Sequence, residues 1–243
     1  METERDGNLD VNKKNEQLTL LSSAAAPRSR SKSSTQPASG PGGDGFYQLK
    51  VTLKGVRPPI WRRFRVPGKI SLARLHLVLL TVMGWQGGHL YEFQIGQRRI
   101  GEPAPRSLMA DFYGEKTEDA NRIELRRVAP REGARLVYVY DFGDDWQHQI
   151  VVEKTTCPEA DADCIVCLDG RRACPPEDCG GVWGYADLTA DLAEPAGADS
   201  PERLRWLEEV HGRHDPEHFD PVEVTRRLAN FNPVGRNQST RRR

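Results

Sequence analysis

The sequence predicts an α+β fold in which a mostly antiparallel sheet packs against helices in one compact domain. Several segments alternate apolar and polar residues with the period of two that half-buried strands show, and others place apolar residues three or four positions apart, as one helix face does. Strands and helices cluster along the chain instead of alternating strictly, which disfavours a doubly wound parallel sheet. No internal repeat or long linker divides residues 46–231, so we assign them to a single domain.

Two terminal segments are expected to lie outside that domain. Residues 1–45 are rich in Ser, Asn, Gly, Lys and Ala, and this composition buries too little apolar surface to offset the entropy lost on ordering. We therefore predict a disordered N-terminal segment. Residues 232–243 carry four arginines and no acidic residue, which predicts a flexible basic tail.

The first two strands are expected on either side of a proline corner. Apolar residues alternate with polar ones from Tyr47 to Leu53 and again, in part, from Ile60 to Val66. The stretch 57–59 between them suits a turn, because proline fixes φ and lacks a backbone donor. The sequence thus predicts two strands joined by this corner.

A helix is expected between Ser71 and Gly84. Serine is a preferred N-cap, and glycine adopts the left-handed conformation that often ends a helix. Four apolar residues in between lie at helical spacing on one face: Leu72, Leu75, Leu79 and Val82. A third strand follows, with alternating Tyr91, Phe93 and Ile95.

Further along, a strand pair is expected at residues 136–142 and 149–154, with Gly143 and Asp144 in the short connection. The last third of the domain is predicted to be helical. Pro201 opens one helix, and Asp220 with Glu223 resembles a capping pair in front of a second one. Apolar residues at helical spacing support both helices: Leu204, Leu207 and Val210 in the first, Val224 and Leu228 in the second.

The composition excludes a membrane protein. Hydrophobic residues make up 37% and charged residues 29% of the chain, which is ordinary for a globular domain. No apolar run approaches the ~20 residues that a membrane-spanning helix needs, and residues 1–17 are polar where a secretory signal would be apolar. We therefore expect a cytoplasmic protein with no membrane partner.

One predicted turn gathers side chains suited to chemistry. Asp141, Asp144 and His148 lie in and beside the connection between two strands. Carboxylates and an imidazole bind divalent cations, and Glu177 with Asp178 would complete the set if the later loop folds back. These five residues then predict the catalytic site of a metal-dependent hydrolase. The alternative is a hairpin whose aspartates accept backbone hydrogen bonds and whose histidine is packed.

All five cysteines fall within residues 157–179. An odd number of cysteines, in a chain without an export signal, argues against a disulfide framework. Thiolates are soft ligands, and four of them close a tetrahedral zinc site. We predict structural zinc, with His148 as an alternative ligand, bound by Cys164, Cys167, Cys174 and Cys179. The alternative is a surface loop with free thiols.

The first part of the domain offers a nucleic-acid surface. Residues 46–98 hold nine Lys or Arg and one Glu, whereas residues 142–231 hold 8 basic and 20 acidic residues. Trp61 beside Arg62 and Arg63 combines a stacking ring with two cations, the composition of a DNA contact. A second interpretation is that Trp61 and Arg62 point to opposite faces of a strand.

Aromatic residues also suggest a small-ligand pocket. Trp85 and His89 follow the first predicted helix, Trp146 lies at the predicted turn, and Tyr185 lies in the last third of the domain. These four residues are expected to line the pocket, although a helix end plugged by an aromatic ring explains the first two equally well. No residue arrangement identifies the ligand.

Four strings, in this order along the chain, resemble the plasmid-pRiA Orf-three-like family. They are VTLKGVRPPIWRR at residues 51–63, MGW with HL at 83–90, YDFGDDW with His148 at 140–148, and ACPPEDCGG with GY at 173–185. The resemblance extends from about Tyr47 to Phe231. It implies a compact α+β domain encoded on plasmids and transposable elements, with no firmly assigned activity.

Members of the family include insertion-element passenger proteins labelled TnpR, which associates the resemblance with mobile DNA. The leading hypothesis is therefore an accessory protein of a plasmid or insertion element that works through contacts with DNA or a mobile-element protein, without catalysis. A metal-dependent hydrolase is the first alternative, and a small-ligand-binding domain is the second.

Overall fold

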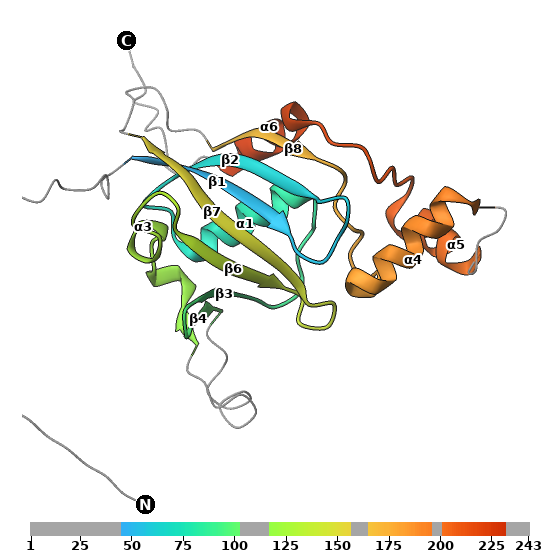
Figure 1. The fold of residues 1–243 in the computed structure, drawn as a ribbon, viewed down its shortest axis with the longest axis horizontal. Coiled ribbons are helices and arrows are strands. Elements are labelled where there is room, and N and C mark those ends of the chain that lie inside the picture. Colours follow the sequence, from blue (N-terminus) through green and yellow to red (C-terminus); the bar gives the residue numbers. More distant parts are fainter. Residues whose placement is uncertain (1–44, 103–116, 157–164, 196–200, 232–243) are drawn as a thin grey trace, which may run out of the picture. The chain divides into compact units, whose positions relative to one another are not determined.

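The strands expected from alternation belong to one eight-stranded sheet with the order β5-β4-β3-β6-β7-β1-β2-β8 (Figure 1). The structure is a computed structural model, and it describes residues 45–102, 117–156, 165–195 and 201–231. The segment 1–44 and the tail 232–243, which we predicted to be disordered and flexible, lie outside the described residues. All pairings are antiparallel except that of β4 with β5. The predicted α+β class is confirmed.

The elements have the following bounds. The strands are β1 (Phe46–Leu53), β2 (Trp61–Pro67), β3 (Tyr91–Ile95), β4 (Arg98–Gly101), β5 (Glu118–Asp119), β6 (Arg135–Tyr140), β7 (Trp146–Thr156) and β8 (Val166–Arg171). The helices are α1 (Leu72–Met83), η1 (Ala120–Arg122), α3 (Leu125–Val128), α4 (Gly181–Ala193), α5 (Pro201–His211), α6 (Pro221–Leu228) and η3 (Ala229–Phe231). Sequence patterns missed β4, β5, η1, α3, β8, α4 and η3.

The core lies on one face of the central strands, and α1 crosses that face (Figure 1). In β1 the side chains of Leu49 and Val51 point inward, and each is fully buried. Val51 pairs with Arg62 of β2 and with Ile150 of β7, so those two residues share its face. The opposite, outer face carries the polar residues of the alternation, which explains why period-two patterns predicted these strands correctly.

Helix α1 begins and ends where its capping residues predict. Ser71 has extended φ and ψ, and its side chain accepts a hydrogen bond from the N–H of Arg74 at 3.2 Å. Gly84 adopts φ 99°, a left-handed conformation, and its N–H donates to the carbonyl of Leu80. The apolar face predicted for this helix is buried, so α1 is held in place by packing against the sheet.

Helix α6 covers the edge of the sheet at β8. Asp220 caps its N-terminus by accepting from the N–H groups of Val222 and Glu223. Thr225 accepts from the N–H of Cys167 and donates to the carbonyl of the same residue, each at 3.1 Å. The threonine hydroxyl therefore satisfies backbone groups that an edge strand would otherwise expose.

At one end of the sheet, several loops come together. Tyr140 at the end of β6 pairs with Tyr91 at the start of β3 and with Trp146 at the start of β7. A Cβ on Gly181, at the start of α4, would lie 2.6 Å from the carbonyl oxygen of Asp144. Only glycine permits this approach, which brings the β8–α4 loop beside the β6–β7 turn.

None of the helices in the described ranges combines the length and the apolar character that crossing a membrane requires.

Candidate functional site

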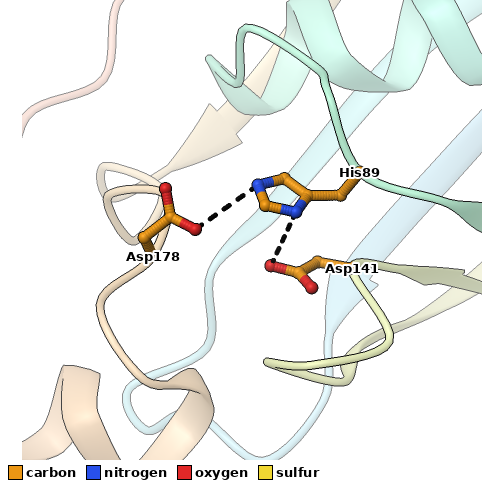
Figure 2. Close-up of side chains that lie close together, drawn as sticks. All are labelled: His89, Asp141 and Asp178. Atoms are coloured by element: carbon orange, nitrogen blue, oxygen red, sulfur yellow. Dashed lines mark ion pairs between the residues drawn. The ribbon is translucent and has the colours of Figure 1, made fainter.

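Three side chains from three separate segments meet at the end of the sheet where β3 begins and β6 ends. His89 lies between α1 and β3, Asp141 follows β6, and Asp178 lies in the loop between β8 and α4. Figure 2 shows the imidazole of His89 between the two carboxylates. Its Nδ1 lies 3.5 Å from Oδ2 of Asp141, and its Nε2 lies 3.4 Å from Oδ1 of Asp178. We call these residues the His–Asp cluster.

Asp141 is fixed by the turn that it begins. Its backbone adopts φ 57°, a left-handed conformation that aspartate tolerates better than most residues. Its N–H donates to the carbonyl of Leu90 at 2.9 Å, and its Oδ1 accepts from the N–H of Gly143 at 2.9 Å. Since Oδ1 is engaged in the turn, Oδ2 faces His89. With its proton on Nδ1, beside Asp141, the ring directs the Nε2 lone pair toward Asp178, where a cation could be shared by the two residues.

The other side of the cluster is open to solvent. The side chain of Asp178 is 68% exposed and that of His89 is 31% exposed. One nitrogen or oxygen from each of His89, Asp141 and Asp178 can be chosen so that all three lie within 4.8 Å of one another, a spacing that suits a single cation. No other group of three His, Cys, Asp or Glu has this geometry in the described part of the chain.

Glu177 and Asp144, both predicted as catalytic residues, lie next to the cluster without joining it. Glu177 accepts from the hydroxyl of Tyr140 at 2.6 Å and from the N–H groups of Gln86 and Gly87 at 3.0 and 3.3 Å. Its oxygens are thus occupied by protein donors. Asp144 is half-buried in the turn beside α4.

His148 belongs to the core, which corrects its predicted role as a catalytic residue or metal ligand. It is 0% exposed, its Nδ1 lies 3.3 Å from the carbonyl oxygen of Tyr138, and Trp85 packs edge-on against its ring. Burial lowers the pKa of His148 to about 4. The physical reason is register: β7 begins at Trp146, and alternation places both Trp146 and His148 on the inner face.

The described cysteines do not converge on one point. Cys167 is buried in β8, with its Sγ 3.7 Å from the carbonyl oxygen of Arg63, whereas Cys174 and Cys179 are half-buried in the next loop. Burial raises the pKa of Cys167 to about 11 and that of Cys179 to about 12, and it also raises the pKa of Cys174. Cys164, the fourth predicted zinc ligand, lies outside the described residues.

The four residues predicted to line a ligand pocket are mostly core side chains. Trp85, Trp146 and Tyr185 are 6%, 1% and 2% exposed. Trp85 lies 4.9 Å from Tyr140 and 6.1 Å from Trp146, measured between ring centroids. Tyr140 in turn lies 5.7 Å from His89 between ring centroids, and His89 is the accessible member of the four.

The predicted nucleic-acid residues lie on different faces of β2. Arg62 is 1% exposed and points inward, where its Nε donates to the carbonyl of Val82 at 2.8 Å. This corrects the expectation that Arg62 belongs to an exposed surface. Trp61 and Arg63 lie on the outer face, and the nitrogen of Lys50 lies 4.8 Å from the Trp61 ring centroid.

Sequence patterns singled out Asp141 and Asp178 but placed His89 only at the edge of a pocket. The signal for its position is the pairing of β3 with β6: Tyr91 and Tyr140 lie opposite each other in antiparallel strands, so the residues before one strand meet those after the other. His89 and Asp141 are the polar residues at those two places.

The fold and the cluster define an α+β protein with a His–Asp cluster at one end of an antiparallel sheet. Residues 45–223 match the family model described as plasmid pRiA4b ORF-3-like protein, and the chain belongs to that family. It is similar to the uncharacterized protein y4hQ of Sinorhizobium fredii (strain NBRC 101917 / NGR234), with 41% identity over 160 residues, 65% of this chain and 79% of that protein.

The fold is also similar to a crystal structure, that of the protein of unknown function MM3350 from Methanosarcina mazei Go1. The two chains are 30% identical, and the TM-score is 0.63. The match covers 75% of this chain and 98% of the other. The predicted family is confirmed by these comparisons.

Proposed function

We propose that this protein binds a divalent cation at the His–Asp cluster and uses it to activate water for hydrolysis. The observation that carries the proposal is the position of His89, whose Nδ1 faces the buried Asp141 while its Nε2 lies 3.4 Å from the exposed Asp178. A histidine that binds a metal generally donates its other ring N–H to a carboxylate. In the cluster, Asp141 Oδ2 lies 3.5 Å from His89 Nδ1, on the side of the ring where such a carboxylate would stand.

Each residue then has a separate task. Nε2 of His89 and the carboxylate of Asp178 coordinate the cation, and Asp141 fixes the tautomer and the orientation of the ring. A bound cation acts as a Lewis acid and lowers the pKa of a coordinated water toward neutrality. Because the protein supplies few ligands and Asp178 is exposed, coordination positions stay open for water and substrate, as in catalytic rather than structural sites.

The donor set narrows the choice of cation. Imidazole suits zinc, iron and other first-row transition metals, whereas carboxylates also accept manganese and magnesium. One imidazole with one carboxylate favours Zn²⁺ or Mn²⁺ over Ca²⁺. With so few protein ligands, we expect a labile cation that dialysis against a chelator removes.

Calorimetric titration with MnCl₂ tests the site. The unmodified protein is expected to bind one Mn²⁺ per chain, and His89→Ala and Asp178→Asn are each expected to weaken binding at least about 10-fold. Asp145→Asn removes a nearby exposed charge outside the cluster and is the matched control for long-range electrostatics. Unchanged Mn²⁺ affinity in both cluster variants would refute the proposal.

The chemistry is tested with p-nitrophenyl carboxylate esters and phosphate diesters at saturating Mn²⁺ or Zn²⁺. Hydrolysis is expected to need the metal and to fall with His89→Ala. If the protein binds the metal but hydrolyses neither class of ester, the hydrolytic step is rejected and only the cation-binding function stands.

The outer face of the sheet supports a second function, that of an accessory protein of a plasmid or insertion element that contacts DNA. Trp61 lies there beside two cations: the Lys50 nitrogen is 4.8 Å and the Arg63 guanidinium carbon 5.1 Å from its ring centroid. An aromatic ring flanked by cations suits bases and phosphates. Arg63 also pairs with Glu153, which reduces the charge available.

Fluorescence anisotropy with a labelled single-stranded oligonucleotide tests this surface at several salt concentrations. Binding is expected to weaken with salt, and Lys50→Ala with Arg63→Ala is expected to reduce the slope of log affinity against log salt by about 1 to 2. Arg62 is left intact, since its substitution would disturb the core. An equal slope in the double variant would exclude DNA contact by this face.

A further inference from the structure

The loop that carries Asp178 is fastened to the rest of the site at two points. This 172–180 loop joins β8 to α4. The indole Nε1 of Trp85 donates to the carbonyl of Pro175 at 3.0 Å. Two residues later in the loop, Glu177 makes the second attachment. Asp178 follows directly, so its backbone position depends on these contacts.

Glu177 contacts both other segments of the His–Asp cluster. Its Oε1 accepts from the hydroxyl of Tyr140 at 2.6 Å, and its Oε2 accepts from the N–H of Gln86 at 3.0 Å. Oε1 also accepts from the N–H of Gly87 at 3.3 Å. Tyr140 directly precedes Asp141, and Gly87 lies two residues before His89. The carboxylate therefore ties together the neighbours of all three cluster members.

The carboxylate of Glu177 is held in one place by hydrogen bonds. Three protein groups donate to its two oxygens, and the shortest of these bonds comes from the hydroxyl of Tyr140 at 2.6 Å. The neighbouring Asp178, in contrast, is exposed, and its side chain has rotamer freedom.

We propose that Glu177 is the positioning residue of the cation site. It holds the Asp178 carboxylate close enough to His89 Nε2 for both groups to coordinate the same cation. The inference rests on the proposed cation-binding function. Glu177 does not coordinate the cation, because its oxygens already accept from Tyr140 and from two backbone N–H groups. Glu177 acts through Asp178, so replacing Glu177 removes the Asp178 carboxylate from the ligands of the cation.

A double-mutant cycle on Mn²⁺ affinity tests this role. Glu177→Ala is expected to weaken binding about 10-fold or more, as is common for residues that orient metal ligands. The double variant Glu177→Ala, Asp178→Asn is expected to bind as weakly as Asp178→Asn, because both changes remove the same ligand. Asp145→Asn again controls for the removal of a negative charge near the site.

A conservative variant separates positioning from folding. Glu177→Gln keeps an amide oxygen that can accept from a backbone N–H, so it is expected to recover part of the affinity lost in Glu177→Ala. The visible spectrum of bound Co²⁺ is a second readout, since it reports the ligand set directly. We expect the same altered spectrum in Glu177→Ala and Asp178→Asn.

The outcomes distinguish the two proposals. If the unmodified protein binds no Mn²⁺, the cation site itself is rejected and the role of Glu177 with it. If the unmodified protein binds and Asp178→Asn weakens binding, but Glu177→Ala does not, the site stands and the positioning role is overturned. The positioning role would also be overturned if the losses of Mn²⁺ binding free energy in Glu177→Ala and Asp178→Asn added fully in the double variant.

Discussion

Replacing Arg62 by alanine is expected to lower the free energy of unfolding by about 4 kcal/mol. The guanidinium is 1% exposed. Its Nε donates to the carbonyl of Val82 at 2.8 Å, and its Nη1 donates to the carbonyls of Trp61 and Arg171, each at 2.9 Å. Alanine would leave these carbonyls short of a donor and would open a cavity beside the ring of Phe219, which stacks on the guanidinium.

Urea unfolding measures the loss, and the next residue along β2 is the control. Arg63 lies on the outer face, where its side chain is 28% exposed and its Nε lies 2.6 Å from Glu153. Arg63→Ala is expected to cost less than about 1 kcal/mol, as exposed ion pairs usually do. Equal losses for the two arginines would show that the buried hydrogen bonds of Arg62 contribute little to stability.

The inward position of Arg62 could be predicted from alternation but not from residue type. In the sequence, Arg62 shares its period with Ile60, Phe64 and Val66, which are core residues in the structure. Arginine is seldom buried, so composition argued for a surface residue. The interior position is stable because backbone carbonyls of α1, β2 and β8 surround the guanidinium, and only the assembled sheet brings those carbonyls together.

The last third of the domain was less predictable for a local reason. Residues 166–171, with the sequence VCLDGR, do not alternate cleanly, and β8 is a strand because it pairs with β2 across a bulge. Cysteine spacing suggested a zinc loop there instead. In the structure, Cys167 fills the core side of β8, so packing accounts for the position of this one thiol.

The His–Asp cluster could be predicted only in part. The sequence predicts Asp141 and Asp178 at one site because carboxylates suit cation binding and because the later loop, which carries Asp178, is expected to fold back onto the turn at Asp141. His148 was chosen as their partner because it is near in sequence, although strand alternation directs it inward. His89 was the correct partner in space, and its identification requires the pairing of β3 with β6, a long-range contact that local patterns do not specify.

Lowering the pH from 7 to 5 is expected to destabilise the protein by about 4 kcal/mol through two buried histidines. His148 is 0% exposed and His76 is 9% exposed. Burial lowers the pKa of each from 6.5 to about 4. His76 stacks on Tyr91 at 3.6 Å between ring centroids, and its Nδ1 lies 2.8 Å from the hydroxyl of Tyr138.

The sign of the effect follows from proton uptake. Between pH 6.5 and 4 the unfolded chain binds a proton at each of these histidines and the folded chain does not, so unfolding becomes easier as the pH falls. Each histidine contributes about 1.4 kcal/mol per pH unit in that window. Between pH 7 and 5 this amounts to about 2 kcal/mol for each histidine and about 4 kcal/mol for the two together. The stability is fully present above pH 6.5, and its loss is complete near pH 4.

Urea unfolding at several values between pH 5 and 6.5, where unpaired carboxylates of the unfolded chain stay ionised, isolates these histidines. The slope of unfolding free energy against pH is expected to reflect one proton each from His76 and His148, with a further contribution from His214, whose pKa burial also lowers. His76→Phe, which keeps a ring stacked on Tyr91, should reduce the slope by about one proton. Gln149→Ala, on the exposed side of β7 next to His148, should leave the slope unchanged. A slope near zero in the unmodified protein would mean that the folded state accepts protons on these rings, which the packing around both residues argues against.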